Sequence, residues 1–342
     1  MKRFITYPQN NGWLRKDHFD VYRSEGRYAI NIGCALSEMG YEVDLISTNF
    51  DNKLFSPTLY DGNKSRYPFY DLCYLSAYYH IFRDVNFKQG IAGVYAFHEI
   101  EEVLKLESHI RDRVIITCHY NTPVLNQLRN KFPELNIKYL PPVYPITSLS
   151  KTFLPFKDLS DRKELNIVVI FSPHFSTKEK LLTALNEKLS IILSFIKSSY
   201  SIKKLTIFER NDSYKETFGV DNTQFFRVPI SYKDLLDLLL NTDLVIFYTT
   251  EIGAGACQYD IVSLGIPFIP LTGRSNLNPP VWVSPLFTEK DLFLTIDSSK
   301  QEVLSYCEKF FNNPKLIFDR FRQHFTDCEF ENWKKIFEGL FV

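Results

Sequence analysis

The stretch that decides the fold lies at residues 241–269 and has the sequence NTDLVIFYTTEIGAGACQYDIVSLGIPFI. It opens with a continuous apolar run, Leu244–Tyr248, of the length and composition typical of a buried parallel strand. A loop with one acid and two glycines follows, then a helical segment, Ala256–Leu264, and a second apolar run, Ile266–Ile269. This order predicts a β-α-β unit of a parallel sheet.

The loop of this unit has the features of a ligand-binding turn. Gly253 and Gly255 would let the backbone approach a ligand closely, and the helix end that follows could hold a phosphate. Asp260, in the first turns of that helix, could accept hydrogen bonds from ribose hydroxyls. An ordinary strand–helix turn, which needs small residues only for packing, explains the same glycines. Both interpretations stay open at this point.

The alternation of strands and helices extends in both directions from this unit. Arg3–Tyr7, an amphipathic helix beginning near Gly26 and Tyr41–Ser47 predict a β-α-β opening. A Pro-rich segment at 140–145 and the polar stretch to about Lys163 predict a linker. The chain is therefore expected to form two doubly wound α/β domains, at 1–150 and 151–325, with ligands beyond the carboxyl ends of the strands and in the cleft between the domains. Further strands are expected at Leu72–Leu75, Val114–Cys118, Ile137–Leu140, Asn166–Phe171, Lys204–Phe208 and Phe225–Val228.

The composition limits the classes of function. The chain has 342 residues with 40 basic and 40 acidic side chains, a length that favours two domains and a formal net charge of zero. Zero net charge disfavours a nucleic-acid coat or a polybasic membrane binder. The six cysteines are scattered without zinc spacing, which indicates free thiols in a reducing cytosol. Since no apolar run suits a signal peptide or a bilayer span, a cytoplasmic location is expected.

Four segments in chain order resemble one enzyme superfamily. Residues 251–267 give the order acid–Gly–x–Gly, an acid inside a helix, then Gly-Ile-Pro. Residues 24–47 have Ser-Glu-Gly-Arg before an amphipathic helix and a strand, and residues 115–121 give a strand ending in Thr-x-His. Asn166–Phe171 is followed by Lys178 and Lys180. Together these segments resemble the nucleotide-sugar-dependent glycosyltransferases of the GT-B superfamily, especially the group 1 or family 4-like enzymes.

The resemblance implies a GT-B fold, in which two Rossmann-like domains face an interdomain cleft. It implies that the first domain binds the acceptor, that the second binds a UDP- or GDP-sugar, and that a helix in residues 326–342 crosses back to the first domain. The activity it implies is transfer of a sugar, a hexose by expectation, from a nucleotide-diphosphate donor. Donor contacts are expected at Gly26, Lys178, Lys180, Arg210, Arg227, Gly253, Ala254, Gly255 and Asp260.

The catalytic residues expected from this resemblance are His119, His18 and Glu251. His18 lies in the loop after the first strand with Asp17 and Asp20 nearby, and His119 follows a predicted strand, so both are candidate bases. The leaving diphosphate needs positive charge and helix-end N–H groups, which this chain could supply without a metal. No cofactor and no metal site are expected, because no acidic pair has metal spacing.

Two departures from the family pattern bear on activity. Glu251 and Asp260 flank eight residues where the family has seven, and Phe171-Ser172 stands where Gly-Arg is usual. One alternative is therefore a catalytically inactive GT-B-like binding subunit. A second is a phage-type DNA-base glucosyltransferase, which the zero net charge disfavours.

The expected acceptor is a glycan or lipid-linked saccharide of surface-polysaccharide synthesis. Without a transmembrane segment, the protein would act in the cytoplasm or as a peripheral protein at the inner face of the membrane. Donor sugar, acceptor and anomeric outcome do not follow from the sequence.

Overall fold

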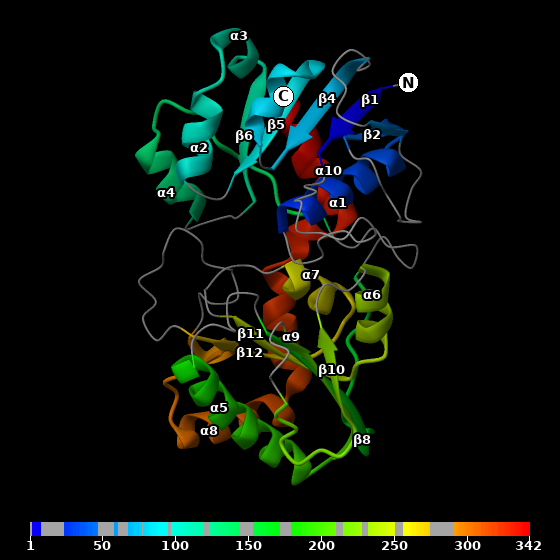
Figure 1. The fold of residues 1–342 in the computed structure, drawn as a ribbon, viewed down its shortest axis with the longest axis vertical. Helices are drawn as coiled ribbons and strands as arrows, with labels where there is room; N and C mark the ends of the chain where they lie inside the picture. Colours follow the sequence, from blue (N-terminus) through cyan, green and yellow to red (C-terminus); the bar gives the residue numbers. More distant parts are fainter. Residues whose placement is uncertain are drawn as a thin grey trace. The chain divides into compact units, whose positions relative to one another are not determined.

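The computed structural model describes residues 2–7, 24–46, 58–60, 68–76, 78–94, 97–119, 124–143, 153–171, 179–209, 215–227, 232–249, 256–273 and 290–342 (Figure 1). The chain divides into two compact units. Unit 1 comprises residues 1–152 together with 326–342, and unit 2 comprises residues 153–325. Each unit has its own parallel sheet.

The sheet of unit 1 has the Rossmann strand order. Its seven described strands follow the order β3-β2-β1-β4-β5-β6-β7, and every pair of neighbours is parallel. The strand order reverses between β1 and β4, which are neighbours in the sheet. The strands are β1 (Arg3–Thr6), β2 (Glu42–Ile46), β3 (Thr58–Tyr60), β4 (Phe69–Leu75), β5 (Asn86–Val94), β6 (Val114–Cys118) and β7 (Lys138–Tyr139).

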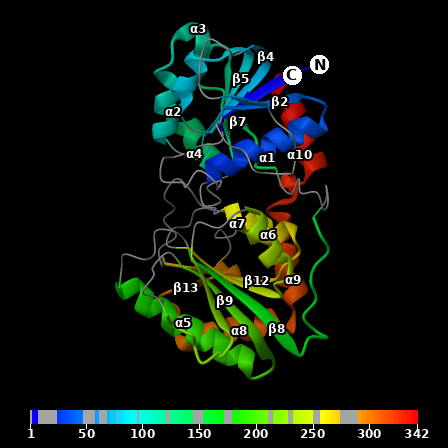
Figure 2. The same ribbon diagram turned by 45° about the vertical axis from the view of Figure 1, so that its right-hand side comes forward.

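Helices α1 and α10 cover one part of this sheet and share a core with it (Figures 1 and 2). α1 ends at Gly40, whose φ of 83° is unfavourable for other residues, and the Tyr41 N–H donates to the Leu36 carbonyl at 2.9 Å. The helices of unit 1 are α1 (Ser24–Glu38), α2 (Phe97–Leu104), α3 (Ser108–Arg111), α4 (Val124–Lys131) and α10 (Phe330–Glu338).

The last helix belongs to the core of unit 1, although about 180 residues separate it from the rest of that unit. Trp333 is fully buried among residues of α1, β1, β2 and β4, and its indole N–H donates to the Pro141 carbonyl at 2.9 Å. Lys138 donates to the Leu340 carbonyl at 2.7 Å. The segment 326–342 thus contributes both apolar packing and hydrogen bonds to unit 1.

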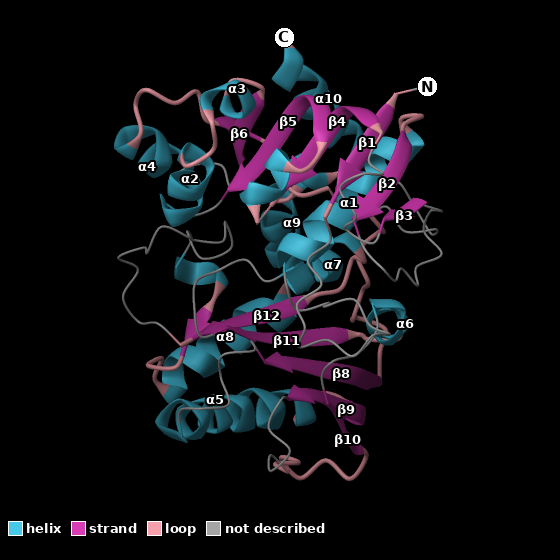
Figure 3. Cartoon of the chain, turned by 45° about the horizontal axis from the view of Figure 1, so that its top comes forward, coloured by secondary structure: helices cyan, strands magenta, loops and turns pink. Residues whose placement is uncertain are grey.

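The sheet of unit 2 repeats the same topology (Figure 3). Its six described strands follow the order β10-β9-β8-β11-β12-β13, again with parallel neighbours throughout. The reversal falls between β8 and β11. The strands are β8 (Glu164–Phe171), β9 (Ser201–Glu209), β10 (Thr223–Arg227), β11 (Leu244–Thr249), β12 (Phe268–Thr272) and β13 (Leu294–Thr295).

Aromatic side chains hold the helices of unit 2 together and against the sheet. Phe195 of α5 stacks on Phe311 of α8 with ring centroids 5.8 Å apart, and Phe321 of α9 lies 4.5 Å from Phe268 of β12. The helices are α5 (Glu179–Lys197), α6 (Tyr232–Leu240), α7 (Ala256–Ser263), α8 (Lys300–Asn312) and α9 (Pro314–Gln323). In the described part of the chain, no helix has both the length and the apolar character needed to cross a bilayer.

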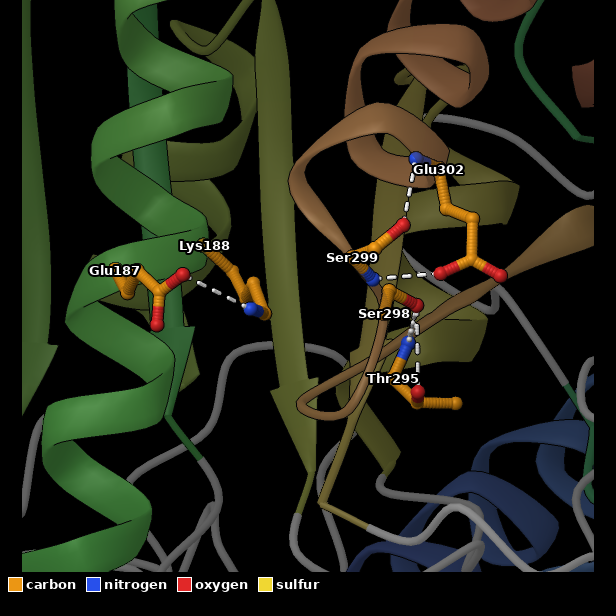
Figure 4. A network of polar contacts seen from close by, with 6 residues as sticks. All are labelled: Glu187, Lys188, Thr295, Ser298, Ser299 and Glu302. Carbon is orange, nitrogen blue, oxygen red and sulfur yellow. Dashed lines mark hydrogen bonds and ion pairs between the residues drawn. The ribbon is translucent and has the colours of Figure 1, made fainter.

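Two sequence signals determine where α8 and α9 begin. Ser299 and Glu302 form a reciprocal capping box at the start of α8, in which each side chain accepts the other residue's N–H (Figure 4). Asn313 caps α9 by accepting the Leu316 N–H at 3.1 Å, and Pro314 occupies the first helical position. Asn313-Pro314 is therefore the junction between the two helices.

The first residues of unit 2 run along the end of α7. The Leu154 N–H donates to the Ser263 carbonyl at 2.7 Å, and the Lys157 N–H donates to the Gly265 carbonyl at 2.8 Å. Gly265 has a φ of 70°, and a β-carbon there would overlap the Pro155 carbonyl oxygen. Gly265, a residue of the predicted donor signature, therefore has a packing reason of its own to be glycine.

The predicted fold class, α/β with two doubly wound parallel sheets, is confirmed by these topologies. The predicted strands at Arg3–Tyr7, Val114–Cys118 and Asn166–Phe171 correspond to β1, β6 and β8. One central strand, β5, was not predicted from the sequence, nor were the edge strands β3 and β13 (Leu294–Thr295).

Candidate active site

In both sheets, the carboxyl ends of the strands lie along one edge because all neighbours are parallel. Ligands of doubly wound folds bind beyond this edge, at the point where the strand order reverses. In unit 1 that point lies between β1 and β4, and in unit 2 between β8 and β11.

His119 follows β6 directly and is the one predicted catalytic residue within the described ranges. Its side chain is only 2% exposed. Nδ1 lies 3.2 Å from the Leu140 carbonyl oxygen, and Nε2 lies 3.1 Å from the Tyr74 hydroxyl. Since a carbonyl oxygen can only accept, Nδ1 carries the proton and the Tyr74 hydroxyl donates to Nε2.

Burial makes His119 a poor base. Desolvation lowers the pKa of its imidazole to about 4, against the weaker opposing effect of the bond to Leu140. The ring of Tyr28, on α1, lies 4.7 Å from the imidazole and covers it further. The sequence predicted His119 as a candidate base beyond the end of a strand, whereas the structure encloses its ring. This geometry suits a structural role that joins β4, β6 and the segment after β7.

The strand ends around His119 fit together closely. A β-carbon at Gly93, at the end of β5, would lie 2.5 Å from the Tyr74 hydroxyl and 2.7 Å from His119 Nε2. Thr6 at the end of β1 donates to the Tyr74 carbonyl at 2.8 Å, so the ends of the two strands at the switch point are joined. The described ends of β1, β4, β5 and β6 are consequently joined by hydrogen bonds and close packing.

Aromatic rings lie beside these strand ends at the switch point. Tyr7 follows β1 and Tyr78 follows β4, with ring centroids 5.8 Å apart and planes at 86°. His80 extends the group, because its ring lies 6.0 Å from that of Tyr78 at 84°. Tyr78 is 38% exposed and His80 is exposed. Burial, with a contribution from Tyr78, raises the pKa of the Tyr7 phenol, so its hydroxyl stays protonated at neutral pH.

The described part of the predicted donor site in unit 2 includes helix α7. Gln258 and Asp260 are both buried there, Asp260 with only 1% of its surface exposed. Asp260 is the fifth residue of the helix, which follows the carboxyl end of β11. Its predicted contact with a ribose remains a prediction.

Lys188 of α5 is a buried lysine of unit 2 that the sequence did not single out (Figure 4). Its Nζ lies 3.3 Å from a carboxylate oxygen of Glu187. Hydrogen bonds from Ser299, helped by the charge of Lys188, also lower the pKa of Glu302 on α8. The Glu187 carboxylate thus compensates this ammonium, which indicates a structural role for Lys188.

The remaining predicted site residues are only partly covered by the structure. Gly26 lies inside the first turn of α1, not in a loop before it. Lys180 belongs to α5 and Arg227 to β10, but their side chains lie outside the description. The other predicted residues lie outside the described ranges altogether: His18, Lys178, Arg210, Glu251, Gly253, Ala254 and Gly255. Among the residues that are described, no group of three His, Cys, Asp or Glu side chains could hold a metal ion.

Comparison with known proteins gives a likeness in structure but none in sequence. No protein-family model and no curated protein matches the sequence. Among solved structures, a sucrose-phosphate synthase from Thermosynechococcus elongatus is 12% identical, with a TM-score of 0.55 over 98% of this chain and 96% of the other. An α-glucosyltransferase in complex with UDP is 11% identical, with a TM-score of 0.56 over the full length of both chains.

The chain has the GT-B fold. The likeness to each of these two structures extends over both units of the chain, and both matched proteins are glycosyltransferases. A protein from Listeria monocytogenes assigned as a UDP-N-acetylglucosamine 2-epimerase also matches, at 11% identity and a TM-score of 0.50, over 97% of this chain and 94% of its own. The fold therefore serves more than one reaction on sugar nucleotides, and function must be argued from the site.

The aromatic and hydroxyl groups at the edge of unit 1 were missed by sequence reasoning. Tyr74, Tyr78 and Tyr79 all lie in or directly after a strand that was predicted, Leu72–Leu75. Polar aromatics at the carboxyl end of a predicted parallel strand were the signal that could have identified them.

Proposed function

We propose that this protein is a glycosyltransferase that moves a sugar from a nucleotide-diphosphate sugar to an acceptor. The observation that supports it most is the fold shared with glycosyltransferases over the whole length of the chain, including enzymes solved with UDP and with UDP-glucose. Two Rossmann-ordered sheets give two ligand-binding edges, as a two-substrate reaction requires. We place the donor on unit 2 and the acceptor on unit 1.

On the donor side, backbone N–H groups at Gly253, Ala254 and Gly255 and the amino end of α7 would stabilise the diphosphate. Asp260 would accept hydrogen bonds from the ribose. Glu251, with the basic side chains of Lys178, Lys180, Arg210 and Arg227, would complete the site.

The reaction breaks the bond between the anomeric carbon and the diphosphate oxygen and joins that carbon to an acceptor oxygen, whose proton is lost. The leaving diphosphate gains charge in the transition state, and fixed N–H groups and cations stabilise it. In this proposal they take the place of a metal, so turnover is expected to persist in EDTA. If the reaction inverts the anomeric centre, His18 is the candidate base, because His119 is enclosed and its pKa is low.

For the acceptor we favour a glycan or lipid-linked saccharide of surface-polysaccharide synthesis, glycosylated on the cytoplasmic side of the membrane. A DNA base is the second candidate, because an α-glucosyltransferase solved with UDP and a 13-mer DNA matches 100% of this chain with a TM-score of 0.56. The charge distribution counts against DNA. Each unit has 20 basic and 20 acidic residues, so neither has the positive excess of a duplex binder.

Donor binding tests the assignment of unit 2. In calorimetric titrations with UDP-, GDP- and ADP-sugars, we expect one nucleotide family to bind and Asp260→Asn to weaken it at least tenfold. Asp243→Asn is the matched control, because Asp243 is a buried carboxylate at the opposite, amino end of β11, where it accepts the Asn166 N–H at 2.8 Å. Circular dichroism of both variants establishes that they fold. Equal affinity in all three proteins would remove Asp260 from the site, and binding of no nucleotide sugar would overturn the proposal.

A further inference from the structure

Three aromatic residues lie together where unit 1 is expected to receive a ligand. Tyr7 and Tyr78 follow the two strands on either side of the switch point, and their rings meet edge to face at 5.8 Å. His80 lies edge to face with Tyr78 at 6.0 Å. Tyr7, Tyr78 and His80 together form the aromatic platform. Aromatic rings partly open to solvent at a ligand-binding edge bury large areas when a flat ligand stacks on them.

The backbone holds Tyr78 in place in an unfavourable conformation. Its φ of 53° and ψ of 46° are left-handed, a region that residues with a β-carbon rarely adopt. The next residue, Tyr79, turns inward and donates its hydroxyl to the Gly93 carbonyl at 2.8 Å. The Ile81 N–H donates to the Tyr78 carbonyl at 3.0 Å. These bonds hold the backbone next to Tyr78, whose ring is partly open to solvent, and strain of this kind is typical of ligand-contacting positions.

The charges near the platform favour an uncharged ligand. Arg83, in the turn that begins at Tyr79, is held by Glu107 at 2.9 Å and by the Lys105 carbonyl at 3.0 Å, so its guanidinium is already engaged. Unit 1 as a whole has as many acids as bases. A nucleic acid would require cations for its phosphates beside the stacking rings, whereas a neutral sugar ring requires only an apolar surface and hydroxyl partners. The protonated Tyr7 hydroxyl supplies such a partner.

We propose that the aromatic platform of Tyr7, Tyr78 and His80 binds an uncharged sugar ring of the acceptor by stacking. This inference deepens the proposed function and rests on it for the name acceptor. The apolar C–H face of the sugar packs against the Tyr78 ring, and the Tyr7 and His80 side chains lie beside it. The acceptor is therefore a neutral glycan in preference to DNA.

The test measures sugar binding directly, without requiring turnover. Saturation-transfer NMR with the methyl glycosides of glucose, galactose, mannose and N-acetylglucosamine is followed by titration of those that bind. Tyr78→Gly removes the ring and also relieves the left-handed strain, so the variant should fold, and we expect its affinity to fall at least tenfold. Tyr78→Phe keeps the ring and should stay within about threefold of wild type. Phe69→Ala is the matched control, because Phe69 is 54% exposed at the opposite end of β4, and it should not change binding.

Several outcomes would overturn the platform. Unchanged glycoside affinity in Tyr78→Gly, or an equal loss of affinity in Phe69→Ala, would be such an outcome. So would the failure of every glycoside to bind. A last one is binding of a 13-mer DNA duplex with a hydroxymethylated base, instead of the glycosides, that depends on Tyr78. Nucleotide-sugar titrations of the same variants separate this inference from the proposed function. Tyr78-dependent glycoside binding without any nucleotide-sugar binding would uphold the platform and overturn the transferase. If the nucleotide sugar binds normally but glycoside binding does not depend on Tyr78, the platform is overturned and the transferase proposal is upheld.

Discussion

Burial decides what single residues at the edge of unit 1 can do. The sequence identified His119 correctly as the residue after a strand, but the same observation could not show that Tyr28, Tyr74 and the Leu140 carbonyl enclose its ring. These contacts join residues far apart in the chain, and no local pattern records them. A histidine at a strand end can be a base or a bonded core residue, and only its neighbours distinguish the two.

The enclosed imidazole should make stability depend on pH. Well above pH 6.5, the ordinary pKa of histidine, His119 is neutral in both the folded and the unfolded state and contributes nothing to the pH dependence. Below pH 6.5, the unfolded chain binds a proton that the folded chain binds only near pH 4, so stability falls through that window, by up to about 3 kcal/mol. Urea unfolding of wild type and His119→Gln at pH 7 and pH 4.5 measures the effect, and the variant should lose less stability between the two.

The control for that experiment is His109→Gln, since His109 is an exposed histidine on α3. Gln at position 119 can still accept the Tyr74 hydroxyl, and any lost bond to Leu140 costs the same at both pH values. If the free energy of unfolding changes with pH to the same extent in wild type and in His119→Gln, burial does not hold the imidazole neutral.

At the scale of elements, local signals predicted most strands and helix ends. Apolar runs predicted β1, β6, β8 and β11, and the structure has glycine and proline at two helix boundaries, Gly40 after α1 and Pro314 at the start of α9. Strand β5 was not predicted because Lys88, Gln89 and two glycines interrupt its apolar run. The reason for Gly93 is tertiary, since a β-carbon there would meet Tyr74 and His119. A residue that resembles a strand breaker can thus be required by packing across the sheet.

Helix α10 should stabilise unit 1 and leave unit 2 unaffected. Trp333→Phe keeps an aromatic ring but leaves the buried Pro141 carbonyl without its indole donor, which should cost about 1–3 kcal/mol. Hydrogen exchange followed by mass spectrometry should show lost protection in α1 and β1, whereas α5 and α8 keep theirs. Glu338→Gln, an exposed change on the same helix, should alter neither. Loss of protection in unit 2 alone would mean that residues 326–342 act on the other unit.

At the scale of the whole molecule, the repeated Rossmann order accounts for the fold, and the alternation of strands and helices predicted it. The donor side was predicted from motifs at residues 251–260 by resemblance, and most of those residues lie outside the described ranges. The aromatic platform of the proposed acceptor site could not be predicted, because Tyr7, Tyr78 and His80 come together only once β1 and β4 pair. The class of reaction depends on the donor site and the acceptor site together, and identifying the reaction products determines it.

The most direct test of the central claim is detection of sugar transfer. The full chain is incubated in EDTA with a panel of nucleotide sugars, neutral glycans and a hydroxymethylated DNA duplex, and products are identified by mass spectrometry. We predict a glycan that gains one sugar for each nucleoside diphosphate released, with the duplex unmodified. Epimerised nucleotide sugar without transfer, or no product from any donor, would contradict the account.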